Sequence, residues 1–154
     1  MPFPPLTGSR LTDLLVHAHR RRRIGVLLVR RGGFAVGVFD GRTLVASKVD
    51  SSYVQGTTKA GGWSQQRYAR RRANQAAAAF ADAADAAFRV LGDGHLDALV
   101  CGGDRPAVRS VRADPRLSRL PEPTGPWLQI KDPKKRVLEA MPEQFLAVRI
   151  ELVP

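Results

Sequence analysis

The sequence contains few of the residues that build disulfides and metal centres. Its 154 residues include one cysteine, Cys101, and three histidines. A single cysteine cannot form a disulfide within the chain, which fits a reducing compartment. The histidines and the cysteine match no zinc spacing. The first apolar segment, Ile24–Val29, has no acidic residue, which disfavours a two-metal nuclease. We therefore expect neither a metal nor another cofactor.

Long apolar runs are also missing. No segment approaches the roughly 20 apolar residues that a membrane-spanning helix needs, and the proline-rich start Met1–Leu6 lacks the basic and apolar regions of a secretory signal. We expect a cytoplasmic protein without membrane contact. The length and the hydrophobic fraction of 44% suit one domain with its own core.

Acidic residues are scarce in the first half of the chain. Residues 1–75 contain 14 Lys and Arg but only 3 Asp and Glu, whereas residues 76–154 contain 11 of each kind. The whole net charge of +11 therefore arises in the first half. This asymmetry favours a polyanionic partner. The alternative is a solvated surface in an arginine-rich protein, with 20 Arg against 5 Lys, but such a bias should spread over both halves.

The apolar pattern of the first 50 residues predicts one short helix and a three-stranded sheet. The helix is expected over Leu11–His19, and the strands over Ile24–Val29, Phe34–Phe39 and Thr43–Val49. An Asp-Gly pair at residues 40–41 is a strong hairpin signal. The three strands should form an antiparallel meander.

A long helix is predicted next, over about Gln65–Leu91, with Ser64 as its N-cap and Gly92 at its end. Its apolar face should pack on the sheet, while Arg67 and Arg71 point away from it. The expected apolar face consists of Ala69, Ala73, Ala76, Ala77, Phe80, Ala84, Ala87, Phe88 and Leu91.

The rest of the chain predicts further α/β units. Leu96–Cys101 should be a buried parallel strand, followed by a glycine turn, Asp104 as a helix cap and a helix to about Arg112. A weaker strand over Trp127–Ile130, a helix over Lys134–Ala140 and a final strand over Phe145–Val153 complete the prediction. We expect an α/β fold with a mixed sheet, residues 1–22 forming an N-terminal extension and residues 23–154 a single domain.

The most informative segment is a glycine-rich loop that leads into a basic helix. Gly61 and Gly62 allow close backbone approach, and Gln65 and Gln66 offer uncharged amides that donate and accept hydrogen bonds. Trp63 could stack on a base or anchor the loop on the domain. A loop of about fifteen residues is usually functional or disordered. The functional interpretation is preferred to that of an unspecialised surface loop.

The segment Lys59–Arg67, placed between a three-stranded meander and a long helix, resembles the catalytic loop of the Vms-like release factors, in particular their stand-alone actinobacterial branch. These are peptidyl-tRNA hydrolases related to the middle domain of eukaryotic and archaeal class I release factors. The resemblance extends from about Arg23 to Pro154. It implies an RNase H-like α/β fold with the glycine–glutamine loop at the start of the long helix.

The family motif Gly-x-x-Gln maps onto Gly62 and Gln65, with two residues between them instead of the Gly-Gly-Gln of classical release factors. Gln65 is the preferred catalytic residue, and the adjacent Gln66 is the alternative. Glutamine is neither an acid nor a base near pH 7, but it can orient a water molecule and stabilise developing charge. The implied RNA contacts are Lys59, Trp63, Arg67, Arg70, Arg71 and Arg72, to which the run containing Arg22 and Arg23 would add affinity.

The resemblance implies a ribosome-associated enzyme that hydrolyses the peptidyl-tRNA ester of stalled nascent chains without reading a codon. Its partners would be the large ribosomal subunit and peptidyl-tRNA, and we expect a monomer. One alternative is cleavage of the tRNA backbone near its acceptor end. Another is a non-catalytic RNA-binding or ribosome-binding module.

Overall fold

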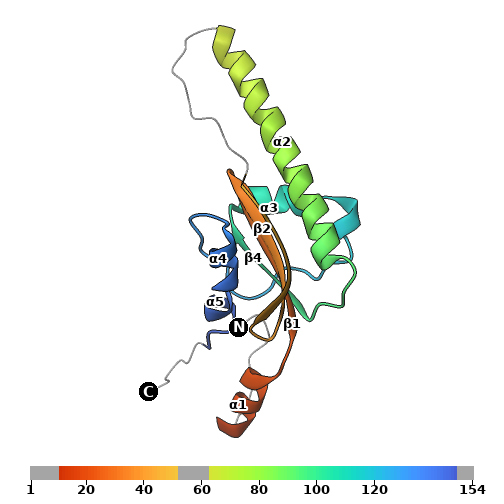
Figure 1. The fold of residues 1–154 in the computed structure, drawn as a ribbon, viewed down its shortest axis with the longest axis vertical. Helices are drawn as coiled ribbons and strands as arrows, with labels where there is room; N and C mark the ends of the chain where they lie inside the picture. Colours follow the sequence, from red (N-terminus) through yellow and green to blue (C-terminus); the bar gives the residue numbers. More distant parts are fainter. Residues whose placement is uncertain (1–10, 52–62, 149–154) are drawn as a thin grey trace.

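The computed structural model describes residues 11–51 and 63–148 of the chain. These residues form a small α/β body from which one long helix projects (Figure 1). In chain order the elements are α1 (Leu11–His19), β1 (Arg23–Arg30), β2 (Gly33–Asp40), β3 (Thr43–Asp50), α2 (Trp63–Leu91), β4 (Ala98–Gly103), α3 (Arg105–Arg112), the 3-10 helix η1 (Pro115–Leu117), α4 (Lys135–Glu139) and α5 (Pro142–Phe145).

The sheet is mixed and has the strand order β3-β2-β1-β4. β1, β2 and β3 form the predicted antiparallel meander, and β4 pairs with β1 in parallel, with Val26 opposite Val100. β1 and β2 are buried along nearly their whole length, as expected for central strands covered on both faces. The mixed α/β fold predicted from the sequence is confirmed.

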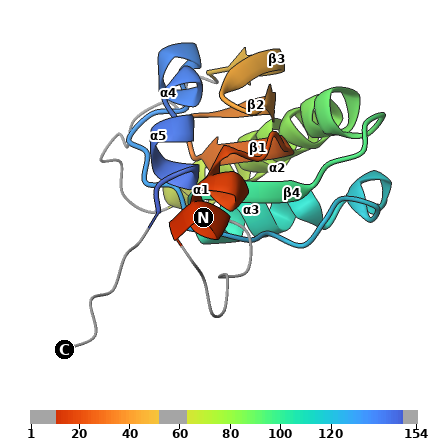
Figure 2. The same ribbon diagram turned by 90° about the horizontal axis from the view of Figure 1, so that it is seen from below.

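Helices cover both faces of the sheet. The core on one face joins α2, α3 and η1 to the strands through residues such as Ala87, Val108 and Leu117. The core on the other face contains the chain after residue 128, with Leu138 and Phe145 packed on the strands. Figure 2 shows α4 and α5 on the opposite side of the sheet from α2. The domain is therefore a three-layer sandwich with one sheet in the middle.

The predicted strand over Trp127–Ile130 is not formed. This part of the chain touches β4 only at two isolated bridges, between Leu99 and Pro123 and between Gly102 and Leu128. Pro123 and Pro126 have no backbone N–H, so the segment cannot maintain a continuous ladder along β4. Leu128 is nevertheless fully buried.

The predicted final strand over Phe145–Val153 is also wrong within the described residues. Phe145 ends α5, and residues 146–148 are not in a strand. Pro142 at the start of α5 has the backbone angle that a first helical turn requires. The buried Phe145 ring packs edge-on against Phe39, with ring centroids 5.3 Å apart. Residues 149–153 lie outside the described part of the chain.

Gly102 and Gly103, predicted to form the turn after the strand, are the last two residues of β4, which leads into α3 through Asp104. Gly103 has a φ of +88°, and a Cβ there would lie 2.2 Å from the carbonyl oxygen of Val29. Asp104 occupies the N-cap position of α3, but its side chain makes no capping hydrogen bond. Its carboxylate instead accepts the backbone N–H of Arg31 at 3.2 Å. Gly103 is therefore explained by its close approach to β1, and Gly102 by its close approach to Leu128, whose carbonyl oxygen would lie 2.5 Å from a Cβ there.

Candidate functional site

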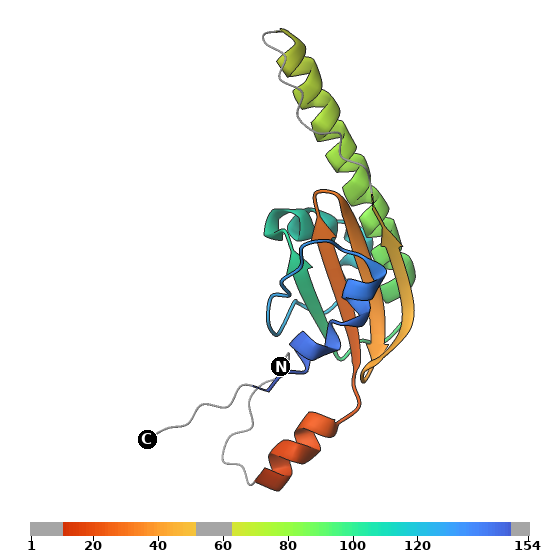
Figure 3. The same cartoon turned by 60° about the vertical axis from the view of Figure 1, so that its left-hand side comes forward.

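Among the described residues, the N-terminal half of α2 projects from the body with no other helix or strand beside it. Residues 65–75 are all exposed, and Figures 1 and 3 show this half of α2 extending beyond the sheet. We call residues 65–75 the stalk. The predicted packing of Ala69 and Ala73 on the sheet is wrong, because no sheet surface lies opposite them. The outward position of Arg67 and Arg71 is confirmed.

The stalk places its first residues far from the core. α2 has 29 residues, so it is about 43 Å long at 1.5 Å per residue. The first fully buried residue of α2 is Ala83, which lies about 27 Å along the helix axis from Gln65. Gln65 and Gln66 therefore lie at the far end of a helix that no other described element accompanies.

The stalk carries positive charge without compensation. The exposed arginines are Arg67, Arg70, Arg71 and Arg72, and none is ion-paired with a carboxylate among residues 11–51 and 63–148. α2 has no acidic residue in its first turn, where the helix dipole already favours an anion. Like charges at i and i+4, such as Arg67 and Arg71, repel by about 0.2–0.5 kcal/mol per pair. Phosphate groups would relieve this repulsion.

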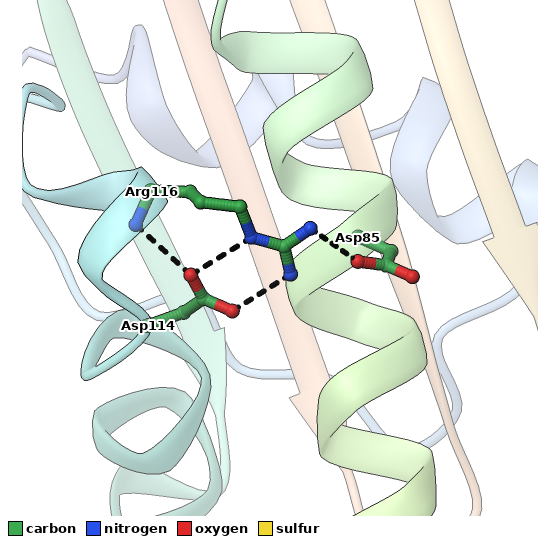
Figure 4. Close-up of polar contacts among 3 residues, drawn as sticks. All are labelled: Asp85, Asp114 and Arg116. Atoms are coloured by element: carbon green, nitrogen blue, oxygen red, sulfur yellow. Dashed lines mark hydrogen bonds and ion pairs between the residues drawn. The ribbon is translucent and has the colours of Figure 1, made fainter.

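The C-terminal part of α2, residues 83–91, which we call its root, is fixed to the body by both packing and polar contacts. Ala83 and Ala87 are fully buried on the sheet, where the small side chain lets the helix approach closely. Arg116 of η1 forms an ion pair with Asp85 of α2 at 2.6 Å and donates two side-chain hydrogen bonds to the carboxylate of Asp114 (Figure 4). The stalk therefore continues a helix whose lower half is fixed.

The structure brings only part of the predicted site together. Gln65 and Gln66 lie in the first turns of α2, and both are exposed. The helix begins at Trp63, so Ser64 lies within it and is not the predicted N-cap. Lys59 and Gly62 lie outside the described residues. The contacts of the Trp63 side chain are likewise outside the described part, so its role stays a prediction.

Arg22 and Arg23 lie at the opposite end of the molecule from the stalk. They are beside the start of β1, next to α1 (Figure 1). The Arg22 guanidinium donates to the carbonyl of His17 at 2.9 Å, and burial together with nearby Arg20 lowers the pKa of Arg22. The backbone N–H of Arg23 donates to Asp97 at 2.7 Å. These residues cannot share a contact with Gln65, and their role in RNA binding stays a prediction.

The described residues offer neither a metal site nor an activated thiol. No group of three or more His, Cys, Asp or Glu side chains in ranges 11–51 and 63–148 is placed to hold a metal ion. Burial raises the pKa of Cys101 to about 12, so its thiol is not an activated nucleophile. No helix in the described part of the chain is long and apolar enough to cross a bilayer.

Sequence reasoning overlooked a second basic surface, on α3. Arg105, Arg109 and Arg112 share one side of this helix, while Ala107 and Val108 face the core. The spacing i, i+4, i+7 in a predicted helix could have revealed it. Trp127, predicted only as part of a strand, lies beside Arg105.

The chain matches the model of a known protein family. The family described as Actinobacteria/chloroflexi VLRF1 release factor matches residues 22–151, which is most of the chain. No curated protein matches the chain. The family match confirms the resemblance inferred from the Lys59–Arg67 segment.

Proposed function

Because the chain belongs to the Actinobacteria/chloroflexi VLRF1 release factor family, we propose that it hydrolyses the ester bond of peptidyl-tRNA on the large ribosomal subunit. The reaction would release stalled nascent chains without recognition of a stop codon. We further propose that the protein acts in the cytoplasm, as a monomer, and without a cofactor.

One observation supports this function best: the two glutamines are at the exposed end of the basic stalk. A single helix is only about 10–12 Å wide with its side chains, so it can enter a channel that would exclude the domain. The channel leading to the peptidyl-tRNA ester would be lined by RNA phosphates. The four stalk arginines follow Gln65 and Gln66 directly, so phosphates on the channel wall would hold the glutamines at its end.

The proposed reaction is attack of water on the ester carbonyl. The bond between the carbonyl carbon and the ribose oxygen breaks, the peptide leaves as a carboxylic acid, and the ribose oxygen takes up a proton. Gln65 would orient the water through its side-chain amide and help to stabilise the developing oxyanion. Gly62, in the family motif Gly-x-x-Gln, would let the backbone approach the ester. Proton transfer would rely on the surrounding RNA and water, because an amide is neither acid nor base near pH 7.

Binding of RNA by the stalk is part of the same proposal. Arg67, Arg70, Arg71 and Arg72 would contact phosphates, and Lys59 and Trp63 would contact RNA ahead of the helix. Arg22 and Arg23 would contact a separate part of the ribosome. The RNase H-like assignment of the fold is supported by the strand order β3-β2-β1-β4. In this order β1 has an antiparallel neighbour, β2, on one side and a parallel neighbour, β4, on the other.

The test is peptide release from peptidyl-tRNA bound to isolated large subunits. We expect Gln65→Ala to reduce the release rate by about 100-fold or more, the range seen when a single charge-stabilising donor is removed. The release rate of Gln66→Ala, compared with that of Gln65→Ala, shows which of the two neighbouring glutamines is essential. Gln75→Ala is the matched control, since Gln75 is an exposed glutamine at the base of the same stalk.

The products identify the bond that is cut. Ester hydrolysis leaves full-length tRNA on a denaturing gel, whereas cleavage of the phosphodiester backbone gives a shortened tRNA. Shortened tRNA would refute the proposed reaction. Release by Gln65→Ala and Gln66→Ala at the wild-type rate would show that neither glutamine takes part in it.

A further inference from the structure

A cleft of about 590 Å³ lies on the body between α3 and the chain that follows η1. Its walls include Arg105, Arg109 and Arg112 from α3, and Glu122 and Trp127 from the facing segment. It belongs to the same sheet face as the root of α2, because α3 and α2 share one core. The cleft is thus separate from Gln65 at the end of the stalk.

A cation–π pair, Arg105 on Trp127, forms one wall of the cleft. The indole N–H of Trp127 donates to the carbonyl oxygen of Gly103 at 2.8 Å, which fixes the ring at the end of β4. The guanidinium carbon of Arg105 lies 4.3 Å from the centroid of this ring. This is a cation–π contact that holds a planar, charged group over a planar ring.

The cleft is positively charged. Arg105 and Arg109 are exposed, and neither is ion-paired with a carboxylate in the part of the chain that the structure describes. Arg112 pairs with Glu122 at 3.1 Å and closes the far side. Two guanidinium groups that no described carboxylate neutralises, beside an aromatic ring, suit a ligand that has both an anionic group and a flat face.

We propose that this cleft binds a nucleotide of single-stranded RNA. A base stacks on the outer face of the Arg105 guanidinium, which Trp127 supports from below, and the adjoining phosphate is bound by Arg109. Stacking on arginine planes and aromatic rings is the usual way in which proteins hold unpaired bases. The site gives the protein a second RNA contact on the body, and it does not depend on ester hydrolysis at Gln65.

The position of the cleft suits this role. α3 contacts α2 and β4 directly, and the root of α2 is fixed to the body through Arg116 and Asp85. RNA bound in the cleft would therefore set the direction in which the stalk projects. Two rigidly linked contacts bind more tightly than either alone, because the second forms within the same complex.

The experiment uses the Trp63→Phe variant of the full chain, in which Trp127 is the single remaining tryptophan of the two. Titration with a five-residue oligoadenylate should change the Trp127 emission, and a fluorescein-labelled copy gives the affinity by anisotropy. Removing both cleft arginines, Arg105→Ala with Arg109→Ala, should weaken binding about tenfold or more and abolish the emission change.

The matched control is Lys135→Ala with Arg136→Ala on the opposite sheet face. Both residues are exposed, and the pair removes the same charge. It should leave the emission change intact and affect affinity less than twofold. Equal weakening by the two pairs, or no emission change with oligoadenylate, would overturn the proposal. So would an equal response to tripolyphosphate or to an oligoglutamate, which lack a base. Peptide release by the wild type tests the proposed reaction separately.

Discussion

Arg116 Nη1 lies 2.6 Å from Asp85 Oδ1, and this ion pair joins the short helix η1 to the root of the long helix α2. The same guanidinium donates to both carboxylate oxygens of Asp114. It also lies over the Phe88 ring, at 5.6 Å from the centroid. One side chain therefore fixes the helix at the point where the stalk needs its support.

This cluster should make part of the stability depend on acid pH. The side-chain hydrogen bond from Arg116 lowers the pKa of Asp114 to about 2, below the value of about 3.9 in an unfolded chain. The contribution is therefore complete above about pH 4 and is lost as the pH falls toward about 2. Thermal unfolding should show the wild type more stable than Arg116→Gln at pH 6, and the difference should shrink between pH 4 and pH 2. A difference that stays constant over this range would contradict this role of Asp114.

Close packing at the root of α2 predicts that a larger side chain is tolerated at one end of the helix and not at the other. Ala87 is fully buried on the sheet, so Ala87→Leu should lower the free energy of unfolding by about 1–3 kcal/mol through overpacking. Ala73 is exposed in the stalk, so Ala73→Leu should change it by less than about 0.5 kcal/mol. Chemical denaturation measures both, and similar effects of the two changes would show that the stalk packs on the body.

Breaking the stalk should reduce peptide release strongly without unfolding the body. Ala73→Pro removes one helical hydrogen bond and clashes with the preceding turn, at a local cost of about 3 kcal/mol. The buried part of α2 begins only at Ala83, so the Tm of the body should remain within a few degrees. Peptide release should fall at least tenfold, while Ala73→Ser should retain most of it. Full release by the proline variant would show that a continuous stalk is not required.

The stalk arginines should account for a measurable share of the salt dependence of ribosome binding. Changing Arg67 and Arg71 to alanine together removes two phosphate contacts. The slope of log K against log salt should then become less steep by about 1–2. The control Lys135→Ala with Arg136→Ala removes the same charge from the far sheet face and should leave the slope unchanged. Binding to isolated large subunits at several salt concentrations provides the comparison.

Much of the fold was predictable because local patterns dominate it. Alternating and continuous apolar runs located β1, β2 and β3, and the Asp-Gly turn indicated the antiparallel pairing of β2 with β3. The errors occurred where backbone donors or long-range packing decide the outcome. Prolines interrupt the pairing of residues 123–128 with β4, and Phe145 is buried as the end of a helix against Phe39.

The candidate site was predictable only in part. The Gly62–Gln65 spacing and the one-sided charge identified the family without a structure, and the family match agrees. Arg67 and Arg71 were correctly placed on the outside. The distance of Arg22 and Arg23 from the stalk was not predictable, because charged residues in the same half of a sequence need not lie close together in the folded protein.

The sequence by itself determined the class of fold, the long helix with glutamines at its start, and the concentration of positive charge before residue 76. These features depend on residue type and spacing, which are known directly from the sequence. Only the tertiary structure decided that the N-terminal half of α2 has no sheet beneath it. Eight-residue strands are about 26 Å long at 3.3 Å per residue, and α2 is about 43 Å long. One end must overhang, and packing of Ala83, Ala87 and Leu91 on the sheet makes it the end that bears Gln65.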